Sequence, residues 1–86
     1  MLKRLKIGML VYPHLTHLDL IGPAQVFAMA EEIDIYYAWK NKLAVPTDTG
    51  ISILPTTTLK DCPELDIVFV PGGPGQTAIM QDDEVL

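Results

Sequence analysis

The chain has 86 residues, so it forms one small domain at most, and 49% of its residues are hydrophobic. A domain of this size buries only about 60–65% of the surface of its unfolded chain. This much apolar surface therefore suits a piece whose core is completed by more chain or by a second subunit. The net charge of −5 and the pI near 4.6 argue against nucleic acid or an anionic membrane as the partner.

Residues 7–12 form an apolar run, and a buried first strand is predicted over residues 5–12. The run follows the basic residues Lys3 and Arg4, as in a signal peptide, but it is too short for one and is closed by Pro13. No stretch reaches the length of a transmembrane helix. Cys62 is the single cysteine and cannot form an internal disulfide, so we expect a soluble protein of the reducing cytoplasm.

Two starts compete for the first helix. Thr16 can cap it, with Asp19 three residues on in a capping-box-like position. Alternatively, Gly22 caps it and Pro23 takes the first helical position, where its missing N–H costs nothing. Both hold if a short helical turn leads into a longer helix over residues 23–30. This helix is expected to cover one face of a sheet because its side chains are strongly apolar.

The middle of the chain predicts a second strand and a hairpin. Residues 33–39 form the strand. Residues 43–46 and 51–54 flank a four-residue connection that ends in Gly50, which is the pattern of a β-hairpin. Pro46 and Pro55 place the hairpin at the edge of the sheet. Residues 56–63 are expected to form a surface loop.

Residues 67–70 are consecutive apolar residues that run into Pro71, Gly72 and Gly73. Such a run predicts a strand that is buried on both faces, as in a parallel sheet. Pro71 ends the ladder because it has no N–H to donate. The glycines let main-chain N–H groups come close to a ligand at the carboxyl end of the strand, where open α/β sheets bind ligands.

The C-terminal stretch predicts a short helix over residues 75–81, and the acidic residues 82–84 indicate the start of another helix. The predicted order β-α-β-β-β-β-α is that of a three-layer α/β sandwich with a mainly parallel sheet and an edge hairpin. A doubly wound sheet has helices on both faces and usually five or more strands. We therefore expect residues 1–86 to be the N-terminal portion of a longer domain.

Asp19 is the leading candidate for chemistry. It stands among apolar neighbours near the carboxyl end of the first strand, where a carboxylate can act as an acid, a base or the activator of a thiol. A helix-capping aspartate is an equally good interpretation of its spacing. His14 and His17 are three residues apart and can share one face as metal ligands, but no other His or Cys lies nearby, so loop or surface histidines are the simpler interpretation.

Two further patterns are weak. Cys62 lies in a polar loop between Asp61 and Glu64, whose charges would raise the pKa of a thiol, so we do not expect it to be a nucleophile. Residues 73–78 match the nucleotide-loop pattern G-x-G-x-x-A. They follow a late strand, however, and no acidic ribose partner follows at the required distance, so dinucleotide binding is not expected.

Three segments, kept in order and spacing, resemble the ThiJ/PfpI superfamily of class I glutamine amidotransferase-like domains. They are residues 7–13 (IGMLVYP), 18–27 (LDLIGPAQVF) and 66–73 (DIVFVPGG). The D-L-x-G-P-x-x-V-F pattern resembles the branch that contains isonitrile hydratases (cyclohexyl-isocyanide hydratases) and the sensor domains of AraC-type regulators. The resemblance covers essentially the whole chain.

The resemblance implies a flavodoxin-like fold, usually dimeric, with a nucleophilic cysteine on a strand-to-helix elbow. An acidic residue from the first helix lies beside that cysteine in this branch, and Asp19 is the matching position. Main-chain N–H groups of the P-G-G loop face the reacting centre, which implies roles for Gly72 and Gly73. The implied reaction is isonitrile hydration with no metal or organic cofactor.

The elbow cysteine of the family would lie beyond residue 86, so this chain alone is expected to be inactive. Two alternatives stay open. The chain could belong to a non-enzymatic ligand-sensing domain of an AraC-type transcriptional regulator. It could also be a half-domain that pairs with itself or with a separate chain that carries the cysteine.

Overall fold

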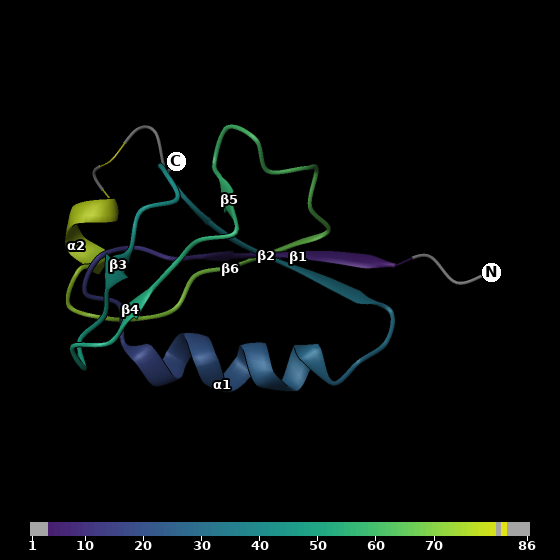
Figure 1. Ribbon diagram of the computed structural model, residues 1–86, viewed down its shortest axis with the longest axis horizontal. Coiled ribbons are helices and arrows are strands. Elements are labelled where there is room, and N and C mark those ends of the chain that lie inside the picture. The colour runs from purple at the N-terminus through teal and green to yellow at the C-terminus, as the bar shows by residue number, and fades with distance from the viewer. Residues whose placement is uncertain (1–3, 81, 83–86) are drawn as a thin grey trace.

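A four-stranded parallel sheet with one long helix along one face forms the centre of the computed structural model, which describes residues 4–80 and residue 82 (Figure 1). The strands of this sheet lie in the order β5-β2-β1-β6. Their bounds are Leu5–Leu10 (β1), Ile33–Trp39 (β2), Thr57–Thr58 (β5) and Ile67–Phe69 (β6). The remaining elements are α1 (His17–Ala28), the two strands of an antiparallel hairpin, β3 (Val45–Pro46) and β4 (Ser52–Ile53), and α2 (Gln76–Ile79).

Residues 7–10 of β1 are all buried, and one face of this strand packs against α1. Met9 pairs with Tyr37 of β2 and with Phe69 of β6. The ring of Phe69 lies edge-on to that of Phe27 in α1, with 6.3 Å between centroids. Because side chains of residues in register on neighbouring strands point to the same face of a sheet, Met9, Tyr37 and Phe69 lie on the face that packs against α1. The buried cluster comprises Ile7, Met9, Leu10, Val11, Tyr12, Leu15, Leu20, Ala24, Trp39, Val45 and Ile79.

The helix α1 begins at His17 and runs through Pro23, so the predicted start at Gly22 is wrong. Leu20 and Ala24 are its buried residues, one turn apart on the same face. The helix has to include both if this face is to pack against the sheet, and this outweighs the preference of proline for the first helical position. None of the helices in the described residues is long and apolar enough to cross a membrane.

The predicted N-cap position of α1 at Thr16 is confirmed, but the capping contact comes from another residue. Thr16 is the N-cap residue, but its side chain makes no capping hydrogen bond. Asp48 of the hairpin connection takes this role, because its Oδ1 accepts a hydrogen bond from the His17 N–H at 2.9 Å. The Asp19 N–H donates to the main-chain oxygen of Thr16 at 3.0 Å. A carboxylate 31 residues along the chain therefore satisfies the first free N–H of the helix.

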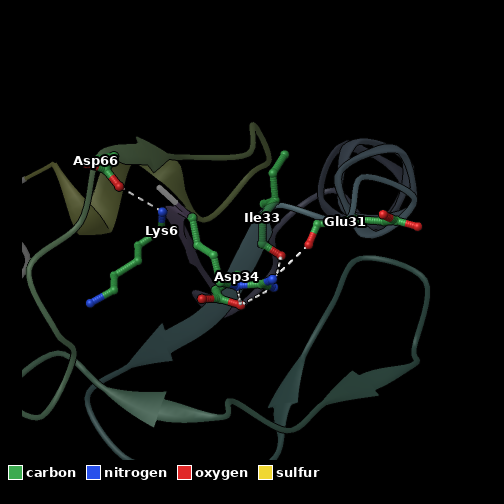
Figure 2. A network of polar contacts seen from close by, with 6 residues as sticks. Lys6, Glu31, Ile33, Asp34 and Asp66 are labelled. Carbon is green, nitrogen blue, oxygen red and sulfur yellow. Dashed lines mark hydrogen bonds and ion pairs between the residues drawn. The ribbon is translucent and has the colours of Figure 1, made fainter. Parts of the chain in front are cut away.

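Polar contacts tie the amino ends of the parallel strands together (Figure 2). The Arg4 guanidinium contacts Asp34 Oδ1 through Nη2 at 2.7 Å and donates through Nη1 to the Glu31 carbonyl at 2.8 Å. On the other side, the Lys6 N–H donates to Asp66 Oδ2 at 2.8 Å, and the Asp66 N–H donates back to the Lys6 carbonyl at 2.8 Å. These contacts join the start of β1 to β2 and to the residue before β6.

The predicted hairpin is confirmed, and β3 and β4 form a two-stranded sheet beside the main one. The predicted surface loop over residues 56–63 is wrong in part, because β5 lies within it and extends the main sheet next to β2. The predicted C-terminal helix is present as α2, while residues 81 and 83–86, and with them most of the second predicted helix start, lie outside the described residues.

The prediction that β6 is buried on both faces is also wrong for this chain. Ile67 is 45% exposed, Val68 is 68% exposed and Val70, just after the strand, is 48% exposed. In the described part of the chain, β6 is the edge strand next to β1. The face of the sheet opposite α1 therefore carries apolar side chains in contact with solvent. We refer to this surface as the open face; Val68 and Val70 are its exposed residues, and the buried Gly8, Leu10 and Ala38 lie beside them on the same side of the sheet.

Candidate functional site

The loop after β6 lies directly against the connection between β1 and α1. A Cβ atom on Gly73, whose φ is +151°, would lie 2.5 Å from the Thr16 nitrogen. A Cβ atom on Gly75 would overlap the carbonyl oxygen of Pro13. These glycines thus permit a close approach to the main chain of residues 13–16. The approach of the loop to a ligand stays a prediction. The two segments meet beyond the carboxyl ends of β1 and β6.

This contact brings Asp19 and Gly72 together. Asp19 is the third residue of α1 and is exposed, and its Oδ2 lies 3.1 Å from the position that a Cβ atom on Gly72 would occupy. A glycine at this position thus leaves room for the carboxylate beside the loop. The spacing that also suited a helix cap instead places a carboxylate over Gly72, within reach of whatever binds at this end of the sheet.

Hydrogen bonds fix the main chain of the loop. The carbonyl oxygens of Pro71, Gly72 and Gly73 accept, respectively, from the Tyr12 hydroxyl at 2.6 Å, the Thr16 N–H at 2.8 Å and the Gln76 N–H at 3.1 Å. By contrast, the N–H groups of Gly72 and Gly73 donate to no residue in the part of the chain that the structure describes. We call these two N–H groups the amide wall. Together with the Asp19 carboxylate they form the candidate site.

Tyr12 is the residue of this region that the sequence analysis missed. Its side chain is fully buried, and burial raises the pKa of its phenol, with a further increase from the charge of Asp19. The hydroxyl therefore stays protonated and donates to Pro71. A signal was available in the sequence, since a tyrosine at the end of a buried strand needs a hydrogen-bond partner for its hydroxyl.

Cys62 lies away from this site. It lines a cavity of about 390 Å³ under the open face, together with Gly8, Leu59, Leu65 and Val68 among others, whereas Asp19 belongs to α1 on the opposite face. The pKa of its thiol is raised, as predicted, but the cause is burial rather than the neighbouring carboxylates. The geometry agrees with the prediction that Cys62 is not the nucleophile of this site.

The two histidines do not form a metal site with other ligands in the described residues, where no group of three candidate ligands is found. His14 is exposed and has a φ of +64°, and its N–H donates to the Pro46 carbonyl at 2.8 Å. His17 is partly buried at the start of α1. The two residues thus belong to the connection that the hairpin holds in place.

Comparisons with known proteins point to one family. The model of the DJ-1/PfpI family matches residues 5–86. The isonitrile hydratase of Pseudomonas putida is 42% identical over 82 residues, which are 95% of this chain and 36% of that protein. The chain therefore spans about a third of the length of this relative.

Solved structures give the same result. The crystal structure of a ThiJ/PfpI family protein from Pseudomonas syringae superposes with a TM-score of 0.91 at 38% identity, over 98% of this chain and 36% of that one. Drosophila melanogaster DJ-1beta superposes with a TM-score of 0.87 at 26% identity, over 95% of this chain and 46% of that one. The flavodoxin-like arrangement predicted for residues 1–86 is thereby confirmed as the N-terminal portion of this fold.

Proposed function

The chain belongs to the DJ-1/PfpI family, and from that premise we propose that it is the N-terminal part of an isonitrile hydratase, which converts an isonitrile and water into an N-substituted formamide. The observation that carries the proposal is the Asp19 carboxylate against Gly72 at the end of the sheet. The 42% identity to the isonitrile hydratase of Pseudomonas putida supports it. The activity would belong to the complete polypeptide, and residues 1–86 alone would be inactive.

The proposed reaction needs a thiolate from a cysteine outside residues 1–86. The thiolate adds to the terminal isonitrile carbon and forms a C–S bond, while Asp19 delivers a proton to the same carbon to give a thioimidate. Water then adds to this carbon and the nitrogen takes up a proton. Breaking of the C–S bond, with loss of the hydroxyl proton to Asp19, releases the formamide and restores both the thiolate and the protonated Asp19. The isonitrile gains the atoms of one water molecule, so no oxidant, reductant, metal or organic cofactor is required.

The geometry suits these roles for the residues of this chain. Asp19 sits on the first turn of α1 and is exposed, so it can reach a substrate bound over the loop. The N–H groups of Gly72 and Gly73 would stabilise the negative charge that develops on oxygen when the water adduct collapses. An N–H donor needs no reorganisation when the carbonyl of the same peptide group is already held by a hydrogen bond. The Pro71 and Gly72 carbonyls, which share peptide groups with the Gly72 and Gly73 N–H groups, are both held in this way.

We further propose that the open face is covered by polypeptide that corresponds to the remainder of the longer relatives, and that the complete protein is a homodimer. Val68 and Val70 are largely exposed on this face and border the cavity of about 390 Å³. Apolar surface of this kind marks a contact with other protein. The partners would thus be a small-molecule substrate and protein, with neither nucleic acid nor membrane bound by this segment, in the cytoplasm.

The test is an assay of the complete protein with cyclohexyl isonitrile, in which N-cyclohexylformamide is followed by NMR spectroscopy. Asp19→Asn keeps the size of the side chain but removes its acid function, and we expect kcat to fall by about 10²–10⁴-fold. Asp61→Asn is the matched control, because Asp61 is an exposed carboxylate in the connection between β5 and β6. Its rate should stay within about twofold of the wild type.

Two results would overturn the proposal. One is the absence of isonitrile conversion by the complete wild-type protein, and the other is an Asp19→Asn variant that keeps the wild-type rate. The intact mass of the purified polypeptide and the sequence that follows residue 86 bear on the predicted alternative. A DNA-binding helix-turn-helix in that sequence, combined with an inactive wild type, would favour the sensor domain of an AraC-type regulator.

A further inference from the structure

We propose that Tyr12 is a positioning residue of the amide wall. Its hydroxyl holds the peptide between Pro71 and Gly72, and thereby aims the Gly72 N–H at the place where the reacting group binds. This inference rests on the proposed function, because it assigns a role to a residue that supports the same site. Tyr12 is not among the positions that the family resemblance implies, which are Asp19, Gly72 and Gly73.

The argument starts from the planarity of the peptide bond. The C=O and N–H groups of one trans peptide point in opposite directions within one plane, and the described chain has no cis peptide bonds. The Pro71 carbonyl and the Gly72 N–H belong to the same peptide. A hydrogen bond that fixes the direction of the Pro71 carbonyl therefore also fixes the direction of the Gly72 N–H, on the side away from Tyr12.

The hydrogen bond between Tyr12 and Pro71 is well suited to this task. The Tyr12 oxygen lies 2.6 Å from the Pro71 oxygen, and both residues are fully buried. A buried hydrogen bond is strong and excludes competition from water. Tyr12 lies in the connection between β1 and α1, whereas Pro71 directly precedes the amide wall. The bond thus spans the two segments that carry the candidate site.

The neighbouring peptide is held in the same way by a different donor. The Gly72 carbonyl accepts from the main-chain N–H of Thr16 at 2.8 Å, which fixes the direction of the Gly73 N–H. Because this donor is main chain, it is unaffected by a change of side chain. Tyr12 supplies a side-chain donor, so its substitution should disturb the Gly72 N–H and leave the Gly73 N–H in place. The two glycines thus provide an internal comparison.

Proximity to Asp19 ties Tyr12 to the same site. The charge of Asp19 contributes to the raised pKa of the Tyr12 phenol, after the larger effect of burial. The phenol is consequently a donor at neutral pH and is not poised to take a proton from a substrate. Its contribution to the reaction is therefore made through Gly72, by orientation, and proton delivery stays with Asp19.

The experiment compares Tyr12→Phe with Tyr37→Phe in the complete protein. Tyr37 is a partly buried tyrosine of β2 whose hydroxyl bonds to no described residue, so it controls for the loss of a phenol oxygen. In ¹H–¹⁵N NMR spectra, Tyr12→Phe should shift the Gly72 amide resonance and leave that of Gly73 nearly unchanged. We expect kcat to fall about tenfold with KM within about twofold, a smaller loss than the ~10²–10³ from removing an oxyanion donor outright.

An unchanged Gly72 resonance, or an unchanged kcat, in Tyr12→Phe overturns the proposal. If the wild type converts no isonitrile, the proposed function fails, but the role of Tyr12 can still be tested with formate as an anion probe. Formate should shift the Gly72 amide resonance in the wild type and shift this resonance less in Tyr12→Phe. If Tyr12→Phe does not fold, 3-fluorotyrosine at position 12 keeps the ring and makes the hydroxyl a stronger donor. It should then shift the Gly72 resonance but not that of Gly73, and the opposite pattern refutes the role.

Discussion

Replacement of Gly73 by alanine tests whether the loop after β6 really lies against the β1–α1 connection. The φ of +151° at Gly73 is rare for a residue with a Cβ atom. Strain of this kind costs about 1–3 kcal/mol. In addition, the new Cβ atom would lie 2.5 Å from the Thr16 nitrogen and 2.7 Å from the Leu15 Cα atom. Because these are main-chain atoms, they cannot move aside as the end of a flexible side chain can.

The loop has to shift to relieve this overlap, and the shift would break the hydrogen bond from the Thr16 N–H to the Gly72 carbonyl. A typical intramolecular hydrogen bond contributes about 0.5–1.5 kcal/mol. Strain and this loss together predict that Gly73→Ala lowers the free energy of unfolding by about 2–4 kcal/mol. Equilibrium unfolding of the complete protein in urea, followed by circular dichroism, measures this difference.

Gly50 provides the matched control. Its φ is +88°, also in the range that favours glycine, but nothing lies within 4 Å of a Cβ atom added there. Gly50→Ala should therefore lose only the conformational term, about 1–2 kcal/mol. If Gly73→Ala is no less stable than Gly50→Ala, the close contact between the loop and the connection does not exist, and the geometry assigned to the amide wall is wrong.

Three other changes follow from the contacts described above. The Arg4 guanidinium lowers the pKa of Asp34, first through its hydrogen bond, so this pair stabilises the fold fully above the ordinary pKa of 3.8 and less as the pH falls below it. The loss of stability in Arg4→Met, measured by urea unfolding, should therefore be largest above this pH and should shrink below it; a pH-independent loss would contradict this. Burial raises the pKa of the Cys62 thiol, so iodoacetamide at pH 8 should alkylate it more slowly than a free cysteine peptide, with a rate that still increases above the ordinary value of 9.0, as mass spectrometry can show. Asp48→Ala removes the carboxylate that accepts from the His17 N–H and should cost about 1 kcal/mol in the same unfolding assay, whereas Asp48→Asn should restore most of it.

Much of the sheet could be predicted because its strands carry local signals. Three of them are apolar runs bounded by turn residues, and such runs identify buried strands without knowledge of their partners. The strand β5 was missed because two threonines, Thr57 and Thr58, carry no such pattern and become a strand only through pairing with β2. The exposure of Val68 was also missed, since an apolar run cannot reveal that none of the described residues pairs with β6 on its outer side.

The start of α1 shows the opposite limit, in which a local signal was misleading. Pro23 suits a first helical position, but the packing of Leu20 against the sheet requires helix before it. Burial of a leucine side chain contributes about 1.5–3 kcal/mol, which is comparable to the cost of a proline inside a helix, about 3 kcal/mol. Together with the burial of the following turn, this is enough to extend the helix through the proline. The position of Asp19 on a helical turn depends on this balance.

The residues of the candidate site could be predicted from the sequence, but the hydrogen bonds that hold them in place could not. Asp19 and Gly72 could be named because they belong to recurrent motifs, and the structure brings them together. Tyr12 and Asp48 could not be assigned their partners, because these lie 59 and 31 residues away along the chain. Contacts between such distant residues depend on how the sheet and the hairpin are placed, which no short segment encodes.

The hairpin gains a role from this distribution of contacts. It holds the β1–α1 connection at three points: the His14 N–H donates to the Pro46 carbonyl, the Asp48 N–H donates to the Leu15 carbonyl, and the Asp48 carboxylate accepts from the His17 N–H. This connection leads directly to the helical turn that carries Asp19 and also supplies the Thr16 N–H for Gly72. None of these hydrogen bonds joins the hairpin to the amide wall. The hairpin nevertheless determines where the β1–α1 connection lies. Changes in the hairpin should therefore affect the site through the position of Asp19 and through the hydrogen bond from the Thr16 N–H to the Gly72 carbonyl. The hydrogen bond between Gly73 and Gln76 lies within the loop after β6 and should persist.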